Sequence, residues 1–256
     1  MQTGIEQVEK FWNSSPCGSR DSENEEGSKA FFEEVERKRY TREPFIHEFA
    51  QFNAWRNKTV LEVGCGMGTD LLQFAKGGAQ VYAVDLTAKG VALTKKRLEL
   101  YGFTGEISKG DAEHLPYTDD KFDLVYSWGV IHHTPNIIKA IAEIYRVTKS
   151  GGKILVMIYH KWSLVSLQVW LRYGLFSLKP FTNIDALLAI HMESPGTKAF
   201  TIQETLTLFK QFKRVKITPV VTPYDLRLAR RFYLPRCVSN FIPNRLGWFI
   251  VVEGEK

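Results

Sequence analysis

The chain has 256 residues, of which 44% are hydrophobic and 24% are charged, and its formal net charge is +6 at pH 7. This composition is typical of a soluble globular protein and excludes a disordered or fibrous chain, and no apolar run approaches the roughly 18 residues of a membrane-spanning helix. The N-terminus lacks an apolar secretory core and the three cysteines are scattered, so we expect a cytoplasmic protein without a disulfide framework.

The first predicted elements are helical. FFEEVERKRY (31–40) places Phe31 and Val35 at helical spacing, after a Ser-, Pro- and Gly-rich loop at 14–28. We expect residues 1–57 to form an N-terminal helical segment, in which FWNSSPCGS (11–19) could act as a flap over an acceptor. Cys17 has no base beside it in the sequence, which favours an ordinary loop cysteine over a nucleophile.

From residue 58 onward, apolar strands alternate with amphipathic helices. Strands are predicted at 59–63, 80–85, 106–111, 122–129 and 153–159, and helices at 68–76, 88–102 and 136–152. Two further strands are predicted at 214–221 and 247–254. This order predicts an α/β fold, a Rossmann-like doubly wound, mostly parallel seven-stranded sheet with helices on both faces. Residues 58–160 would form its core and residues 201–256 its C-terminal part.

Residues 161–200 interrupt this rhythm and are predicted to form a helical cap after the fifth strand. They are rich in leucine and in aromatic residues, namely Trp162, Trp170, Tyr173, Phe176 and Phe181. The cap could line a pocket for an aromatic or isoprenoid acceptor, form its own core, or make a dimer contact. After it, Thr201 and Glu204 predict a capping box, and Pro219 suggests an edge strand or a bulge.

A basic stretch lies between the last two predicted strands. Residues 227–245 mix apolar side chains with the arginines Arg227, Arg230, Arg231, Arg236 and Arg245. Such a mixture suits a peripheral membrane contact or an anionic acceptor. A solvated surface element with buried aromatic residues is the simpler interpretation.

VLEVGCGMGTD (60–70) has the form of a glycine-rich turn between a buried strand and a helix. Such turns bind cofactors that contain adenosine. A dinucleotide fingerprint would place its third glycine at position 69, where this chain has Thr69. Asp85 ends the next strand and could accept hydrogen bonds from both ribose hydroxyls of either a nicotinamide dinucleotide or S-adenosylmethionine.

Four motifs together decide between these cofactors. They are VLEVGCGMG, VYAVDLT, GDAEHLPYTDDKFDLVYSWGVIHH and the double glycine before KILVMIY, in this order. The sequence thereby resembles the class I S-adenosylmethionine-dependent methyltransferases, in particular the ubiquinone/menaquinone methyltransferase-like group called type 11. The resemblance is dense over residues 58–160 and loose elsewhere. It implies S-adenosylmethionine as cofactor and S-adenosylhomocysteine as product.

The resemblance also implies which residues surround the cofactor. Those facing its methionine part and sulfonium would be Glu62, Gly64, Cys65, Gly66, Gly68, Ser127 and Trp128. Those facing its ribose and adenine would be Asp85, Leu86, Asp111 and Ala112. The chemistry agrees, because an acid at position 62 suits the ammonium group and would repel the pyrophosphate of a dinucleotide.

The candidate catalytic residues are His132 and His133, which follow the fourth predicted strand. Ligands of open α/β sheets bind at this edge, and histidine suits a general base, so we prefer His133 and keep packing and helix capping as alternatives. No metal site is expected, because adjacent histidines rarely bind one ion. Tyr40 is the candidate lid residue, and Tyr159 and His160 are candidate substrate contacts at the end of the fifth strand.

We therefore predict a methyltransferase for a small hydrophobic or aromatic acceptor, methylated on oxygen or carbon. It would act as a monomer or homodimer, without nucleic acid and with a possible peripheral membrane contact. The alternatives are a non-catalytic protein that binds S-adenosylmethionine and a methyltransferase for a membrane-associated lipid or RNA. An oxidoreductase is the least favoured interpretation.

Overall fold

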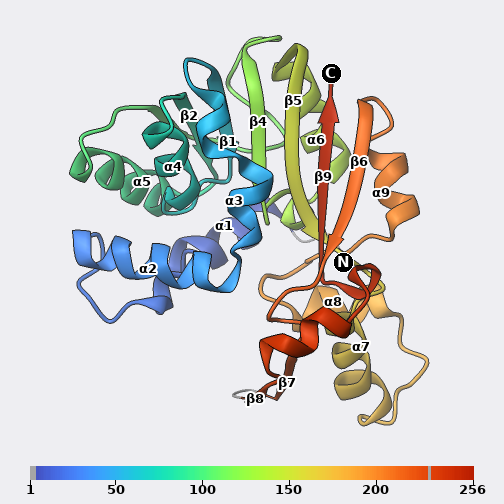
Figure 1. The fold of residues 1–256 in the computed structure, drawn as a ribbon. Helices are drawn as coiled ribbons and strands as arrows, with labels where there is room; N and C mark the ends of the chain where they lie inside the picture. Colours follow the sequence, from blue (N-terminus) through green and yellow to red (C-terminus); the bar gives the residue numbers. More distant parts are fainter. Residues whose placement is uncertain (1–3, 230–231) are drawn as a thin grey trace.

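The computed structural model describes residues 4–229 and 232–256. Its centre is a seven-stranded sheet with the strand order β3-β2-β1-β4-β5-β9-β6 (Figure 1). The strands are β1 (Thr59–Val63), β2 (Gln80–Asp85), β3 (Glu106–Lys109), β4 (Phe122–Trp128), β5 (Thr148–Tyr159), β6 (Lys213–Val220) and β9 (Phe249–Glu255). Only β9 runs antiparallel to its neighbours β5 and β6. The predicted fold class is confirmed.

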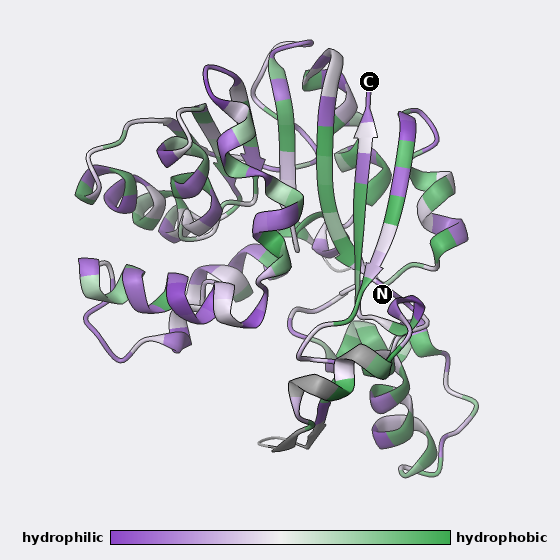
Figure 2. Ribbon diagram, viewed as in Figure 1, coloured by the Kyte–Doolittle hydropathy of each residue, from purple (hydrophilic) through white to green (hydrophobic). Residues whose placement is uncertain are grey.

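The described helices are α1 (Ile5–Ser14), α2 (Lys29–Arg42), α3 (Phe45–Ala50), α4 (Thr69–Lys76), α5 (Ala88–Leu100), α6 (Ile137–Val147), α7 (Leu164–Trp170), α8 (Ile184–His191) and α9 (Ile202–Leu208). Helices α4 and α6 cover opposite faces of the sheet. Leu124 of β4 shares one hydrophobic core with Leu72 of α4, whereas its neighbour Val125 shares a second core with Ile141 of α6. Successive strand residues point to opposite faces, so strands buried on both sides are mostly apolar, as the long hydrophobic stretches of β4 and β5 show in Figure 2.

Two features predicted from local sequence signals, a helix cap and an edge strand, are present. The predicted capping box is present: the Thr201 hydroxyl accepts a hydrogen bond from the Glu204 N–H, and the Glu204 carboxylate accepts one from the Thr201 N–H. Strand β6, which contains Pro219, lies at the edge of the sheet, as the proline suggests.

The predicted helix at 136–152 is too long at its C-terminal end. Helix α6 ends at Val147, and Thr148 donates a hydrogen bond from its hydroxyl to the Ile144 carbonyl at 2.6 Å. Phe122 pairs with Thr148 and Leu124 with Lys153, so the double glycine lies in a bulge of β5. Gly151 has a φ of +75° there, a conformation that glycine adopts without steric cost.

The carboxyl ends of the parallel strands carry the rest of the chain. The cap between β5 and α9 contains α7, a π-helical turn at Leu171–Leu175 and α8, and it lies below the sheet in Figure 1 beside the short strands β7 (Arg227–Ala229) and β8 (Phe232–Tyr233). Strands β2 and β3 extend the sheet on one side of β1, and β4 starts the other side. Ligands of open α/β sheets bind at such a switch point.

Candidate functional site

The glycine-rich turn joins β1 to α4 at the switch point of the sheet. Gly64, Gly66 and Gly68 all have positive φ angles. A Cβ atom at Gly64 would lie 2.4 Å from the Val130 side chain, so only glycine fits there. The Gly66 N–H donates a hydrogen bond to Oδ2 of Asp85 at 2.8 Å, which ties the turn to the end of β2.

A cavity of about 1060 Å³ opens beside this turn. Ligand pockets of proteins usually measure about 300–1000 Å³, so this cavity is large enough for a cofactor and an acceptor side by side. The turn, β2 and the Asp111 segment line one half. The N-terminal segment, the end of β5, the cap and the residues before β9 line the other half.

Most of the residues predicted to surround the cofactor line the first half of the cavity. They are Glu62, Gly64, Cys65, Gly66, Asp85, Leu86, Asp111, Ala112 and Trp128. Two do not line it. Gly68 packs against Thr94 as the N-cap of α4. Ser127 is fully buried and donates its hydroxyl to the Val63 carbonyl at 3.2 Å, so it fastens β4 to β1.

Glu62 is a buried carboxylate with unused hydrogen-bonding capacity. It is 4% exposed, and its Oε2 atom has no hydrogen-bond partner among the described residues. Burial, followed by the nearby Asp70, raises the pKa of its carboxyl well above the ordinary value. A buried polar atom of this kind needs a partner, and the ammonium group of S-adenosylmethionine would supply one.

Asp85 and Asp111 stand at the other positions that an adenosine would need. Asp85 Oδ1 accepts hydrogen bonds from the N–H and the hydroxyl of Thr87, at 2.9 and 2.7 Å. Burial raises the Asp85 pKa. Asp111 Oδ1 accepts a hydrogen bond from the Glu113 N–H at 2.9 Å. Each carboxylate oxygen can accept more than one hydrogen bond, so both side chains keep capacity for a ligand.

An ion pair between the partly exposed Arg39 and the buried Asp70 was not predicted from the sequence. Asp70 is 2% exposed and accepts a hydrogen bond from Nη2 of Arg39 at 2.7 Å. Tyr40 and Tyr126 donate their hydroxyls to the same carboxylate, at 2.8 and 2.7 Å. The Asp70 pKa is lowered, because Arg39 and these hydrogen bonds outweigh burial. The pair clamps α2 onto the start of α4.

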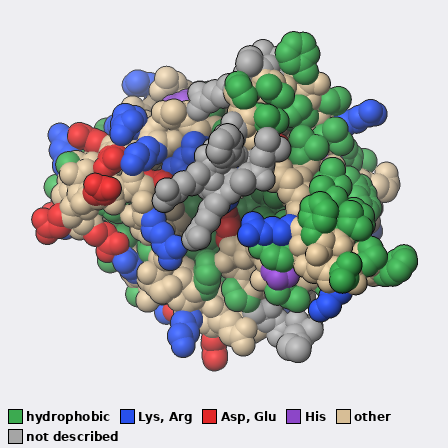
Figure 3. All heavy atoms as spheres, turned by 90° about the horizontal axis from the view of Figure 1, so that it is seen from below, with side chains coloured by type: hydrophobic (Ala, Val, Ile, Leu, Met, Phe, Trp, Pro, Cys, Tyr) green, Lys and Arg blue, Asp and Glu red, His purple; other side chains and the backbone are tan. Residues whose placement is uncertain are grey.

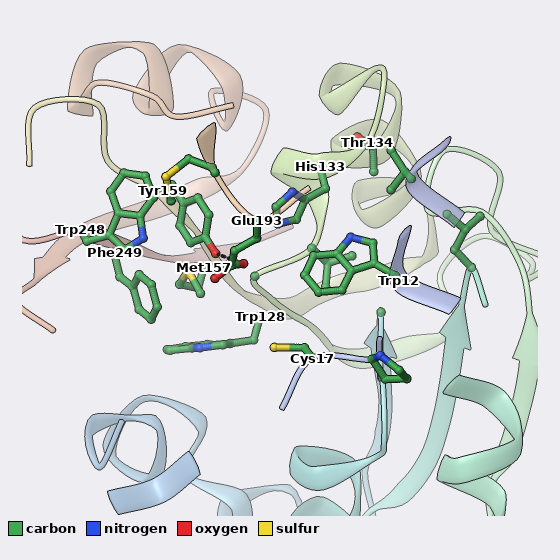
Figure 4. A pocket seen from close by; sticks show the side chains of 18 of the residues that line it. Trp12, Cys17, Trp128, His133, Thr134, Met157, Tyr159, Glu193, Trp248 and Phe249 are labelled. Carbon is green, nitrogen blue, oxygen red and sulfur yellow. Dashed lines mark hydrogen bonds between the residues drawn. The ribbon is translucent and has the colours of Figure 1, made fainter. Parts of the chain in front are cut away.

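Tyr40 therefore lies elsewhere than its predicted lid position. Its hydroxyl points into the ion pair and its ring lies 4.3 Å from His47, so Tyr40 stands behind the cavity wall and does not itself line the cavity. The aromatic residue that covers the cavity from the N-terminal segment is Trp12 of α1. Its ring makes an edge-to-face contact with His133 at 5.4 Å (Figure 4). Trp12 belongs to the segment predicted as a flap.

The two adjacent histidines have different surroundings. His132 is fully buried between His133 and the Tyr159 ring, at centroid distances of 4.1 and 3.9 Å, and it does not line the cavity. Burial and His133 lower its pKa well below the ordinary value. His132 thus stands apart from the substrate contact expected of it, because its side chain points into the packing beneath the cavity wall.

His133 lines the cavity and is held by the cap. Its Nδ1 atom lies 2.7 Å from the Ser194 hydroxyl and 3.1 Å from the Thr197 hydroxyl. Thr197 donates its own proton to the Ser194 carbonyl at 2.7 Å, so its oxygen can only accept from Nδ1. This arrangement favours the tautomer with a proton on Nδ1 and a lone pair on Nε2. Burial lowers the His133 pKa to about 3, so the ring is neutral at pH 7.

Tyr159 and Glu193 meet in the second half of the cavity. The Tyr159 hydroxyl donates a hydrogen bond to Glu193 at 3.0 Å, and its ring stacks on Trp248 at 4.3 Å (Figure 4). Burial raises the Glu193 pKa. Glu193 was not predicted, because it follows α8 within the cap and belongs to no motif. His160 differs from its predicted role: it is buried, lies outside the cavity, and its Nδ1 contacts the Gly247 carbonyl at 3.0 Å.

Cys17 and Glu43 complete the wall near Trp128. Cys17 is exposed and faces the cavity. Its enclosure in the cavity and the Glu193 carboxylate raise the pKa of its thiol, so the thiol is not an activated nucleophile. Glu43 accepts hydrogen bonds from Nε1 of Trp128 and from the Tyr224 hydroxyl, both at 3.3 Å. The wall is therefore aromatic with a few fixed carboxylates.

Three other expectations concern a metal site, a membrane-spanning helix and the arginines of residues 227–245. Within residues 4–229 and 232–256 no three His, Cys, Asp or Glu side chains are grouped to hold a metal ion. In the same residues no helix is long and apolar enough to cross a membrane. Arg227 lines the cavity, whereas Arg230 and Arg231 lie outside the described residues.

Comparison with known proteins locates the strongest similarity in the sheet core. Residues 61–156 match the family model described as "Methyltransferase domain". A 97-residue segment is 38% identical to phthiotriol/phenolphthiotriol dimycocerosates methyltransferase of Mycobacterium tuberculosis, covering 37% of this chain and 35% of that protein. A 118-residue segment is 33% identical to phosphoethanolamine N-methyltransferase 2 of Caenorhabditis elegans, covering 45% of this chain and 26% of that protein.

These alignments span about a third of the length of the curated relatives or less. Among solved structures, the 4+2 cyclase SpnF is similar over 99% of this chain and 97% of its own, with a TM-score of 0.60 and 18% identity. At that identity the similarity concerns the fold alone. The fold therefore extends over nearly the whole chain, whereas the alignments to the curated relatives cover less than half of it.

Proposed function

We propose that the chain is a class I S-adenosylmethionine-dependent methyltransferase, as the match of residues 61–156 to a methyltransferase domain suggests, and that it transfers a methyl group to a small hydrophobic or aromatic acceptor. One observation carries the proposal. A single cavity joins the residues expected to hold the cofactor to a wall of aromatic side chains that includes Trp12, Trp128, Tyr159 and Trp248. A donor and an acceptor could thus meet inside one enclosure.

The first half of the cavity fits S-adenosylmethionine by its donor and acceptor chemistry. Glu62 has the unpartnered buried oxygen that an ammonium group requires. Asp85 and Asp111 would accept hydrogen bonds from the ribose hydroxyls and the adenine amino group. Burial raises the pKa values of Glu62 and Asp85, and a bound cation would favour their charged forms. When bound, this cofactor supplies a methyl group activated by a positively charged sulfur.

His133 is the candidate for handling the acceptor proton. Its Nε2 lone pair is buried without a partner among the described residues, behind the edge-to-face contact with Trp12. A shift of Trp12 with the N-terminal flap would bring an acceptor hydroxyl to it. A neutral imidazole of low basicity suffices, because the proton of a hydroxyl becomes strongly acidic as its oxygen bonds to the methyl carbon. Glu193 is the second candidate, since its carboxyl faces the same space (Figure 4).

The acceptor class is inferred from the second half of the cavity. The names of the two curated relatives describe different acceptors, so sequence similarity does not select one. The aromatic rings instead favour a flat or apolar molecule. Water exclusion and alignment of the acceptor with the methyl carbon are the main needs of such a transfer. The stacked rings of Tyr159, Trp248 and Phe249 would supply both.

Two measurements test the proposal separately. Calorimetry with S-adenosylhomocysteine tests the cofactor half and should show 1:1 binding. Release of S-adenosylhomocysteine during incubation with S-adenosylmethionine and a panel of phenols, catechols, quinols and long-chain alcohols tests the acceptor half. Binding of S-adenosylhomocysteine without its release from S-adenosylmethionine in the presence of any panel member would support the non-catalytic alternative. Absence of binding would refute the proposed function as a whole.

A further inference from the structure

The cap between β5 and α9 carries several large apolar side chains that are almost fully exposed. Phe181 is 100% exposed, Leu178 91% and Phe176 76%, all in the turn between the π-helical segment and α8. Seen from below, Figure 3 shows hydrophobic side chains gathered on the side of the molecule where the cap lies. Contiguous exposed apolar surface marks an interaction site more often than chance placement does.

Local bonds hold this turn in shape with its apolar residues outward. The Trp170 indole donates a hydrogen bond to the Pro180 carbonyl at 3.1 Å. The Lys179 N–H donates to the Gly174 carbonyl at 2.8 Å, and the Leu178 N–H donates to the Leu175 carbonyl at 3.1 Å. The exposure of Leu178 and Phe181 is thus a property of a bonded turn.

The charge of this surface points to one kind of partner. Between residues 164 and 184 the chain has two basic residues, Arg172 and Lys179, and no Asp or Glu. An apolar tip flanked by cations matches the acyl region of a lipid bilayer and its anionic headgroups. Side chains as exposed as Phe181 need no shaped pocket in a fluid lipid phase, whereas a protein partner would have to supply one for each.

The same surface reaches the cavity. Phe176 and Arg172 both line the cavity wall, so the exposed turn continues directly into the acceptor half. We propose that residues 172–181 form a membrane-docking tip that seats the cavity mouth on an anionic lipid surface, from which an amphiphilic acceptor enters. This inference rests on the proposed function for the identity of the acceptor site, but docking itself requires no turnover.

Vesicle co-sedimentation tests the docking tip. The probe is phosphatidylcholine vesicles with and without a third of phosphatidylglycerol. The intact chain should sediment with the anionic vesicles, and added salt should weaken this binding. Phe181→Ser with Leu178→Ser should weaken partition about tenfold or more, because each loses the transfer of a large apolar side chain. Lys179→Glu should weaken binding to anionic vesicles only.

The matched control is Ile138→Ser on α6, which removes an apolar side chain that is 68% exposed at a distance from the cap in the sequence. It should bind vesicles like the unchanged chain. Equal S-adenosylhomocysteine binding by all variants would show that the cavity is intact, so that a docking failure is separate from a failure of the proposed function. Failure of the unchanged chain to bind vesicles, or a dimer that Phe181→Ser dissociates, would overturn the proposal.

Discussion

The Nδ1 atom of His133 lies 2.7 Å from the hydroxyl oxygen of Ser194, a residue 61 positions further along the chain. The first residue follows β4 in the sheet core, and the second closes the cap after α8. The cap therefore does more than cover the cavity, because it fixes the ring orientation of the candidate base. Residues that hold the non-reacting nitrogen of a histidine decide which nitrogen carries the proton.

Removal of His133 should affect turnover more than cofactor binding. We expect His133→Ala to lower kcat about 10²- to 10⁴-fold, the usual contribution of a general base, with S-adenosylhomocysteine affinity nearly unchanged. Ser194→Ala should give a smaller loss in kcat, because it removes only a hydroxyl that orients the ring. The control is His47→Ala, because His47 is exposed and does not line the cavity. Full turnover in His133→Ala would refute the base role and leave Glu193 as the candidate.

Asp85 should be essential for cofactor affinity. Asp85→Ala would remove the charged acceptor of two hydrogen bonds from the ribose hydroxyls, so we expect at least about a hundredfold loss of affinity. Calorimetry with S-adenosylmethionine at micromolar concentration measures this loss. Asp119→Ala serves as the control, because its side chain is 69% exposed. Since Asp85 also bonds Gly66 and Thr87, thermal unfolding must first show that the variant is folded. Unchanged binding would refute the ribose assignment.

The ion pair between Arg39 and Asp70 should be important for stability. Asp70→Ala leaves the partly exposed Arg39 guanidinium and two tyrosine hydroxyls without their shared carboxylate acceptor, which we expect to cost about 2–3 kcal/mol of unfolding free energy. Urea unfolding followed by tryptophan fluorescence measures the loss. Arg39→Met combined with Asp70→Leu should restore part of it, because neither charge then remains without a partner. A loss below about 1 kcal/mol in Asp70→Ala would contradict a clamping role.

The buried histidines should make the fold sensitive to acid. Their folded-state pKa values are lowered, to about 3 for His133, so the unfolded state binds more protons below the ordinary pKa of 6.5. Stability should be complete above pH 6.5 and fall toward pH 3, by about 1.4 kcal/mol per pH unit for each histidine. Urea midpoints from pH 7.5 to 4.5 measure this slope. His132→Gln should flatten it, and His114→Gln should leave it unchanged. Equal slopes in all three proteins would contradict this account.

The parts of the fold governed by periodicity could be predicted from the sequence. All seven predicted strands are present in the sheet, although β5 begins at Thr148 instead of residue 153 and β3 ends at Lys109. Glycine spacing located the turn at Gly64–Gly68. The end of α6 could not be predicted, because the choice between helix and bulge at Gly151 depends on pairing with β4. Local patterns do not contain such long-range contacts.

The candidate site also contains residues that the sequence located and residues whose side-chain directions it could not give. Glu62, Asp85 and Asp111 could be found because they end strands or flank the turn, where their neighbours are close in sequence. The directions of Tyr40, His132 and His160 could not, since each depends on contacts with distant elements: Asp70, Tyr159 and Gly247. Glu193 lies in the cap, where no periodic signal distinguishes a residue that faces the cavity.

The most direct test of methyl transfer uses S-adenosylmethionine labelled in its methyl group. The purified chain would be incubated with it and an extract of the source cells, and the label followed into organic and aqueous phases. We predict label in the organic phase, lost in Asp85→Ala and strongly reduced in His133→Ala. Label that stays with S-adenosylmethionine, although the chain binds it, would contradict the proposed transfer.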